Sequence, residues 1–174
     1  MLPDPIAGVD ADSYAAFVVA NYRRLVGLLL LGGDDIGTAE ELAQDALVRL
    51  YEHRAKLVVQ DAPWAWVCVV ALNLQRSSWR RSAARRRAYR RHGVPLEASD
   101  LPDPDDVLAV RAAVAALPRR QREVVCLRFY ADLPVAIAAA RLGVAEGTVR
   151  ALTHQAITSL RRSLSPQPEE ARHG

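Results

Sequence analysis

Apolar residues recur every three or four positions along most of the chain, and glycine or proline separates the segments that show this pattern. Such spacing places apolar side chains on one face of a helix. The first segment predicts a helix over Ser13–Leu31, which the pair Gly32 and Gly33 ends. Residues 1–12 are rich in Pro, Asp and Gly and are expected to form a flexible lead-in.

Two more helices are predicted in the first half of the chain. Thr38 and Glu41 have the spacing of a capping box, so we expect the second helix to begin there. Its apolar face consists of Leu42, Ala46, Leu47, Leu50 and Tyr51. Pro63 suits the first turn of a third helix, which is expected to run from Trp64 past Arg81.

A proline-rich stretch divides the chain. Residues 92–105 contain Gly93, Pro95, Pro102 and Pro104, and proline disfavours helix both at its own position and at the residue before it. Four amphipathic segments follow, which predict helices over Val107–Leu117, Arg119–Tyr130, Pro134–Leu142 and Glu146–Leu164.

These patterns predict an all-α fold made of two small helical domains joined by a flexible linker. The expected boundaries are 13–91 for the first domain, 92–106 for the linker, 107–165 for the second domain and 166–174 for a polar tail.

Charge is distributed unevenly along the chain, although the formal net charge is only +3. No acidic residue lies between Asp61 and Glu97, and that interval holds Arg76, Arg80, Arg81, Arg85, Arg86, Arg87, Arg90 and Arg91. A basic block of this kind indicates a nucleic-acid surface, and a solvated helix face is the alternative.

Other composition features argue against a secreted or membrane protein. Cys68 and Cys126 lie far apart in apolar segments, so we expect buried free thiols in a reducing cytosol. The apolar run Leu28–Leu31 is too short to span a bilayer. The expectation is a cytoplasmic protein without membrane insertion.

The segment Val135–Leu152 has the spacing of a helix-turn-helix. Ala139 is small where two helices would cross, and Gly143 follows at the turn, where a positive backbone φ favours glycine. The second helix would present polar side chains that donate to base edges or phosphates. The alternative is a plain helical hairpin.

At this point the residues resemble a known family. The run from Leu117 to Val125 (LPRRQREVV), continued by LRFYADL and by Glu146-Gly147-Thr148-Val149-Arg150, resembles region 4 of bacterial RNA polymerase sigma factors. Residues 39–46 (AEELAQDA) and the run from Pro63 through Asn73 to Arg81 resemble region 2. The chain is thereby similar to extracytoplasmic-function (ECF) sigma factors, which have only these two domains.

The resemblance implies partners and site residues. Region 2 would dock on the clamp of the largest subunit of core RNA polymerase, through Glu41, Gln44 and Asp45. Region 4 would dock on the flap of the other large subunit. Promoter DNA is the second partner, and an anti-sigma factor that clamps the two domains is usual in the family. For the acidic helix face, an ordinary solvated surface is the alternative.

The resemblance also places the DNA contacts. The expected minus-ten residues are Trp64, Trp66, Asn73, Arg76, Arg80 and Arg81, with Asn73 engaging a flipped base and either tryptophan offering a stacking surface. Core packing is an equal alternative for the tryptophans, and a surface amide is the alternative for Asn73. The expected minus-thirty-five residues are Thr148, Arg150, Ala151, His154 and Gln155.

Several positions depart from the family pattern. They are Leu72, Ser77, Ile137, Ala138, Ala145, Ala151 and Gln155. Ala145 stands where a serine usually caps the recognition helix, which costs about 1 kcal/mol without compensation. We therefore expect weaker minus-thirty-five contacts than usual, carried mostly by Arg150.

Other function classes fit less well. The four histidines are scattered without carboxylates at metal-ligand spacing, and no phosphate-binding loop occurs, so neither an enzyme nor a cofactor is predicted. A helix-turn-helix regulator that acts without being a polymerase subunit, or a helical adaptor that binds another protein, are the alternatives to a sigma factor.

Overall fold

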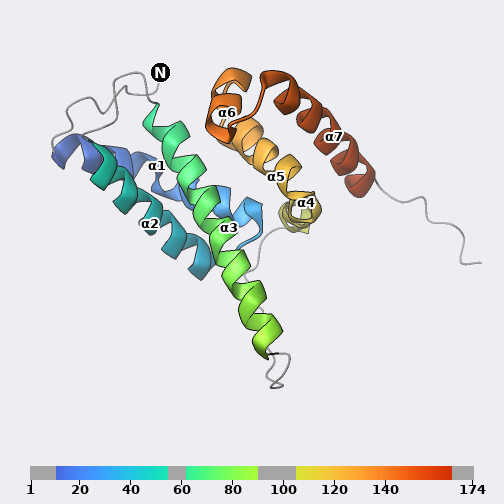
Figure 1. The fold of residues 1–174 in the computed structure, drawn as a ribbon, viewed down its shortest axis with the longest axis horizontal. Helices are drawn as coiled ribbons and strands as arrows, with labels where there is room; N and C mark the ends of the chain where they lie inside the picture. Colours follow the sequence, from blue (N-terminus) through green and yellow to red (C-terminus); the bar gives the residue numbers. More distant parts are fainter. Residues whose placement is uncertain (1–10, 55–61, 90–104, 166–174) are drawn as a thin grey trace, which may run out of the picture.

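The computed structural model describes residues 11–54, 62–89 and 105–165, and this part of the chain is helical (Figure 1). The elements are α1 (Ala11–Gly32), α2 (Ile36–His53), α3 (Pro63–Tyr89), α4 (Asp105–Ala116), α5 (Arg119–Val125), the π-helical turn η2 (Cys126–Tyr130), α6 (Val135–Leu142) and α7 (Glu146–Leu164). The predicted all-α class with two domains is confirmed. Residues 92–104 of the predicted linker lie outside the described residues, whereas Asp105 and Asp106 already belong to α4.

Helices α1, α2 and α3 form the N-terminal domain. Leu25, Leu28 and Leu29 of α1 are fully buried among the other two helices. The segment Ser13–Gly32 is long and apolar enough to cross a membrane by length and composition, a point that the short run Leu28–Leu31 did not reveal. The buried leucines of its C-terminal half belong to the hydrophobic core, whereas Val19 in its N-terminal half is 84% exposed.

Helix α2 begins earlier than the sequence predicted. Its N-cap is Asp35, whose carboxylate accepts hydrogen bonds from the Thr38 backbone N–H at 2.9 Å and from the Thr38 hydroxyl at 2.8 Å. The predicted capping box starting at Thr38 is therefore wrong, because Thr38 occupies the third helical position rather than the cap. These hydrogen bonds hold the pKa of Asp35 below its usual range.

Helices α4 to α7 form the C-terminal domain, in which α6 and α7 make the predicted helix-turn-helix. Gly143 has a φ of 65° and ends α6. The Val144 backbone N–H then donates to the Ala139 carbonyl at 3.1 Å, as in a Schellman motif. Ala139 of α6 and Val149 of α7 are buried at the crossing, as the spacing predicted.

The predicted continuous helix over Arg119–Tyr130 changes its winding at Cys126. From there the backbone forms a π-helical turn that closes with the Ala131 N–H donating to the Cys126 carbonyl at 2.9 Å. A π-turn rotates the following side chains relative to a regular α-helix. Cys126 and Leu127 are buried while Phe129 remains exposed.

The two domains pack against each other, which the sequence did not predict. Helix α3 runs through the middle of the molecule, with α2 on one side and α5 to α7 on the other, while α1 crosses behind it (Figure 1). One continuous hydrophobic core includes Leu72 and Leu74 of α3 together with Val124 and Leu127 of the C-terminal domain. Burial of this apolar surface is the main force that holds the domains together.

Close contacts at the domain interface require a glycine. A Cβ atom at Gly27 of α1 would lie 1.9 Å from the Tyr130 hydroxyl oxygen, so only glycine lets Tyr130 approach in this way. Nearby, the Trp64 indole N–H donates to the Ala131 carbonyl at 2.9 Å, and Arg24 lies over the Trp64 ring. The interface therefore combines apolar packing with directed contacts.

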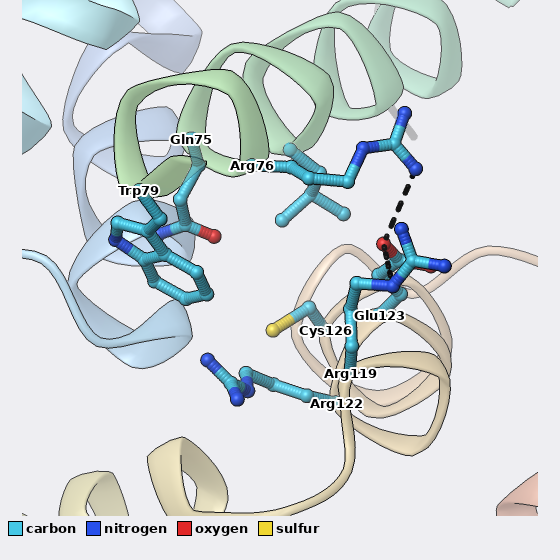
Figure 2. A pocket seen from close by; sticks show the side chains of 8 residues that line it. Gln75, Arg76, Trp79, Arg119, Arg122, Glu123 and Cys126 are labelled. Carbon is cyan, nitrogen blue, oxygen red and sulfur yellow. Dashed lines mark ion pairs between the residues drawn. The ribbon is translucent and has the colours of Figure 1, made fainter. Parts of the chain in front are cut away.

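A polar cluster completes this interface (Figure 2). Arg122 of α5 donates to the Gly32 carbonyl at the end of α1, at 3.1 Å, and its guanidinium stacks on the Trp79 ring. Trp79 and Gln75 of α3 in turn donate to the buried Asp34 carboxylate, at 2.7 and 2.8 Å. Burial raises the pKa of Asp34, and the two hydrogen bonds partly oppose this rise.

The N-cap of α2 generates a first prediction. Asp35→Ala should lower stability by about 1 kcal/mol, or roughly 2–4 °C in melting temperature for a protein of this size. Because the pKa of Asp35 is lowered in the folded state, its charge-dependent stabilisation is present above the ordinary pKa, about 3.9, and is lost as pH falls through the folded-state pKa. Thermal melts of Asp35→Ala and of the unmodified protein, at neutral pH and at about pH 3, measure the loss of stability and its pH dependence.

The control for Asp35 is Glu40→Ala, which removes an exposed carboxylate from the same helix. It should leave the melting temperature nearly unchanged, since isolated surface substitutions cost little. Equal melting temperatures for Asp35→Ala and Glu40→Ala at neutral pH would contradict the capping role.

The polar cluster generates a second prediction. Arg122→Ala removes the hydrogen bonds to the carbonyls of Gly32 and Leu117 and the stacking on Trp79. Hydrogen bonds to charged groups contribute about 1.5–3 kcal/mol, so we expect the domains to separate more readily. Small-angle X-ray scattering should show a larger radius of gyration, whereas the control Arg161→Ala, an exposed arginine of α7, should not. Unchanged scattering of Arg122→Ala would refute this role of Arg122.

Candidate nucleic-acid interface

Helix α3 presents one outward face with residues predicted to contact minus-ten DNA. Trp66, Asn73 and Arg80 follow each other at seven-residue spacing, about two helical turns each, and therefore point to the same side. Asn73 and Arg80 are exposed, and Trp66 is half-buried with its ring stacked on His53. Arg81, also exposed, lies beside this face. A flat ring, an amide and a guanidinium are thus aligned along one surface.

Trp64 does not belong to this face. It lies nine residues from Asn73, which places it on the opposite side of α3. Its indole N–H is bound to Ala131 of the C-terminal domain, and its ring is covered by Arg24. Of the two tryptophans predicted to offer a stacking surface, the structure brings only Trp66 to the side of Asn73.

Arg76 links this face to the domain interface. Its guanidinium donates to the Asn73 side-chain oxygen at 2.6 Å and lies 3.8 Å from the Glu123 carboxylate of α5. Arg80 donates to the Ser77 hydroxyl at 3.2 Å. The other arginines of the basic block, Arg85, Arg86, Arg87, Arg90 and Arg91, lie outside the part of the chain whose side chains are described.

Helix α7 presents the residues predicted to contact minus-thirty-five DNA. Val149 and Ala156 are buried against the rest of the domain, so the opposite side of the helix faces outward. The residues Thr148, Arg150, Ala151, His154 and Gln155 are all exposed. The structure therefore brings the predicted residues together on one outer surface.

Two of these side chains already have partners. Arg150 forms an ion pair with Glu146 at 2.6 Å, and both side chains are largely exposed. An exposed pair of this kind contributes about 0–1 kcal/mol, so a phosphate or base edge can replace it at small cost. The Gln155 side-chain oxygen accepts a hydrogen bond from Gln121 of α5 at 3.3 Å. This bond ties the recognition helix to its own domain.

The start of α7 has the predicted weak cap. Ala145 is the N-cap residue and offers no side-chain hydrogen bond. Glu146 lies in the first turn, where a carboxylate interacts favourably with the helix dipole. Part of the missing capping energy is recovered in this way.

Helix α2 carries the residues predicted to bind the polymerase. Glu41, Gln44 and Asp45 are exposed, opposite the buried Leu42, Ala43, Ala46, Leu47 and Leu50. Sequence reasoning missed Val48, which lies on the same outer side with an exposed fraction of 55%. The signal was available, since Val48 falls outside the apolar stripe of the helix. An apolar side chain among carboxylates suits a protein contact better than DNA.

The cysteines are not reactive groups. Both are free and fully buried. Burial raises the pKa of Cys126 to about 12, and it raises the pKa of Cys68 as well. Both thiols therefore stay protonated near neutral pH. In the described part of the chain, no three His, Cys, Asp or Glu side chains gather in a way that suits a metal ion.

Comparison with known protein families matches both domains. The family pattern for sigma-70 region 2 matches residues 11–86, and the pattern for sigma-70 region 4 matches residues 113–162. The two matches occur in the order predicted from the sequence and correspond to the two domains of the fold.

Relatives that match this chain over most of their own length support the same assignment. The ECF RNA polymerase sigma factor SigF of Caulobacter vibrioides is 32% identical over 166 residues, which cover 89% of this chain and 88% of that protein. SigL of Mycobacterium tuberculosis is 31% identical, covering 88% of this chain and 85% of the relative. An RNA polymerase sigma-E factor of Streptomyces avermitilis is 32% identical over 77% of this chain and 75% of its own length.

Solved structures share the fold. The sigma factor RpoE of Bartonella quintana, crystallised with the anti-sigma factor NepR, superposes with a TM-score of 0.76 at 21% identity, covering 88% of this chain and 98% of that one. CnrH, in complex with the cytosolic domain of CnrY, gives a TM-score of 0.69 at 18% identity, covering 90% of each chain. With region 2 and region 4 in order and these relatives along nearly its whole length, the chain belongs to the ECF family of RNA polymerase sigma factors.

Proposed function

We propose that this chain binds core RNA polymerase and directs it to specific promoters as a non-enzymatic subunit in the cytoplasm. The observation that carries the proposal is the pair of exposed surfaces on separate domains, one on α3 around Asn73 and one on α7 around Arg150. Two DNA-facing surfaces suit two promoter elements held at a fixed spacing. The acidic face of α2, with Glu41, Gln44, Asp45 and the exposed Val48, is proposed as the polymerase-binding surface.

The proposed minus-ten site consists of Trp66, Asn73, Arg76, Arg80 and Arg81. An unstacked base can lie on the Trp66 ring or hydrogen-bond to the Asn73 amide, and the arginines suit the adjacent phosphates. Trp64 is not part of this group, since it lies on the opposite side of α3 and its indole N–H is bound to Ala131.

The proposed minus-thirty-five site consists of Thr148, Arg150, Ala151, His154 and Gln155. Arg150 is its principal contact, because its guanidinium can bond two acceptors of a guanine edge. The structures of the similar proteins RpoE and CnrH are of complexes, RpoE with an anti-sigma factor and CnrH with the cytosolic domain of CnrY. An anti-sigma factor is accordingly proposed as a partner of this chain.

Core-dependent initiation tests the function as a whole. The chain is mixed with core polymerase and a promoter of the ECF type, and specific transcripts are measured. Initiation that requires both polymerase and this chain is the expected result. Promoter binding without polymerase would instead favour a separate helix-turn-helix regulator, and neither activity would favour a protein-binding adaptor.

Asn73 gives a prediction for the minus-ten site. Asn73→Ala should reduce open-complex formation about fivefold, because one hydrogen bond to a base is worth about 1 kcal/mol. Abasic nucleotides are placed one at a time along the non-template strand of the minus-ten element. At one position the difference between Asn73→Ala and the unmodified protein should disappear. If the difference persisted at every position, Asn73 would not contact a base.

Arg150 gives a prediction for the minus-thirty-five site. Arg150→Ala should reduce initiation at a matched promoter by about tenfold or more, within the 1–3 kcal/mol of a bidentate base contact. It should have little effect on a promoter with a scrambled minus-thirty-five element. The control Arg161→Ala removes an exposed arginine from the last turn of the same helix and should preserve discrimination between the two promoters. If Arg150→Ala reduced initiation equally on both promoters, Arg150 would contact a phosphate rather than a base.

A further inference from the structure

The end of α2 carries a ring that sequence reasoning did not connect to the DNA surface. His53, in the last turn of α2, stacks on Trp66 of α3. The ring centroids are 5.3 Å apart and the ring planes differ by 24°. This geometry is that of an offset-stacked aromatic pair. The predicted stacking surface therefore consists of two rings from two helices rather than of a tryptophan alone.

The imidazole is the outer ring of this pair. Trp66 is half-buried and packs against the hydrophobic core, whereas His53 is exposed. Because the core and the imidazole both cover the indole ring, Trp66 has little surface of its own left for a ligand. An incoming ring meets the face of the imidazole that points away from Trp66 first.

The last turn of α2 is held in place by contacts on its other side. The Arg54 guanidinium donates to the Tyr51 carbonyl at 2.6 Å and lies over the Tyr51 ring. Tyr51 meets Tyr14 of α1 edge-on, with 5.0 Å between the ring centroids, and the Tyr14 hydroxyl donates to the Leu47 carbonyl at 2.9 Å. These contacts fix the backbone from which the imidazole projects. A preorganised ring loses little conformational freedom when a ligand stacks on it.

The ring pair lies on the same side of α3 as Asn73. Trp66 and Asn73 are seven residues apart, which is about 10.5 Å along the helix axis. Stacked bases of one DNA strand follow each other at about 3.4 Å. The ring pair and the Asn73 amide are therefore far enough apart to bind different nucleotides of the same single strand.

We propose that His53 is the outer stacking residue of the minus-ten site. An unstacked base of the non-template strand lies on one face of the imidazole, and the other face rests on Trp66. Histidine is among the side chains on which unstacked bases lie, and its ring also has an N–H donor for a neighbouring phosphate. This role rests on the proposed promoter function, because it adds a residue to the same site.

Promoter melting by the holoenzyme tests the role of His53. The full chain is assembled with core polymerase, and open complexes are measured on a promoter of the ECF type. His53→Ala should reduce open-complex formation about fivefold or more, the lower end of what one stacking ring contributes. His53→Phe keeps a flat ring and should recover most of this loss. The matched control His53→Leu keeps apolar bulk without a flat face and should not recover it.

Abasic nucleotides locate the contact. They are placed one at a time along the non-template strand of the minus-ten element. At one position the difference between His53→Ala and the unmodified protein should disappear, because the base that stacks on the ring is already missing. That position should differ from the one at which Asn73→Ala and the unmodified protein become equal.

Other roles of His53 give other results. A ring that only supports Trp66 would give a loss that persists at every abasic position, and a polymerase contact would weaken binding of His53→Ala to core polymerase. More open complexes with His53→Ala would mean that the base displaces the imidazole from Trp66. Each of these results, an unchanged level of open complexes, or equal levels with His53→Phe and His53→Leu would overturn the proposal. No open complex with the unmodified chain would overturn the proposed promoter function and this role with it.

Discussion

Packing of α5 and η2 against α3 and α1 is the interaction on which the rest of this structure depends. Arg122 joins α5 to the last carbonyl of α1 and to the ring of Trp79, while Trp79 and Gln75 hold the buried Asp34. Around this polar cluster lies one hydrophobic core that includes residues of both domains. Two small domains thereby share one larger core than either would bury alone, and small domains gain stability from such added burial.

This packing gives α3 two distinct sides. The side toward the C-terminal domain carries Trp64, Gln75 and Trp79, whose polar groups are already bonded within the protein. The other side carries Trp66, Asn73 and Arg80 and stays accessible. Arg76 lies between them and contacts both Asn73 and Glu123. Separation of the domains therefore changes the surroundings of the minus-ten residues directly, without any change within α3.

The sequence predicted much of the fold because its signals are local. Helical periodicity located the elements, and Gly143 marked the turn of the helix-turn-helix because few other residues accept its positive φ. The predicted start of α2 at Thr38 was wrong. Asp35 and Thr38 are both good capping residues, and spacing alone does not choose between them. The winding change at Cys126 was missed, because a π-turn leaves no distinct residue pattern.

By itself the sequence determined the helical class and the outward residues of α2 and α7, because these follow from the spacing of apolar positions within one helix. The order of the two domains followed from the proline-rich stretch between them and from the family resemblance of each half. Only the tertiary structure decided that the Trp64 indole bonds to Ala131, that the two domains share one core, and that Arg76 and Arg120 meet at Glu123. These facts depend on contacts between residues far apart in the chain, and periodicity carries no information about which helix covers which face.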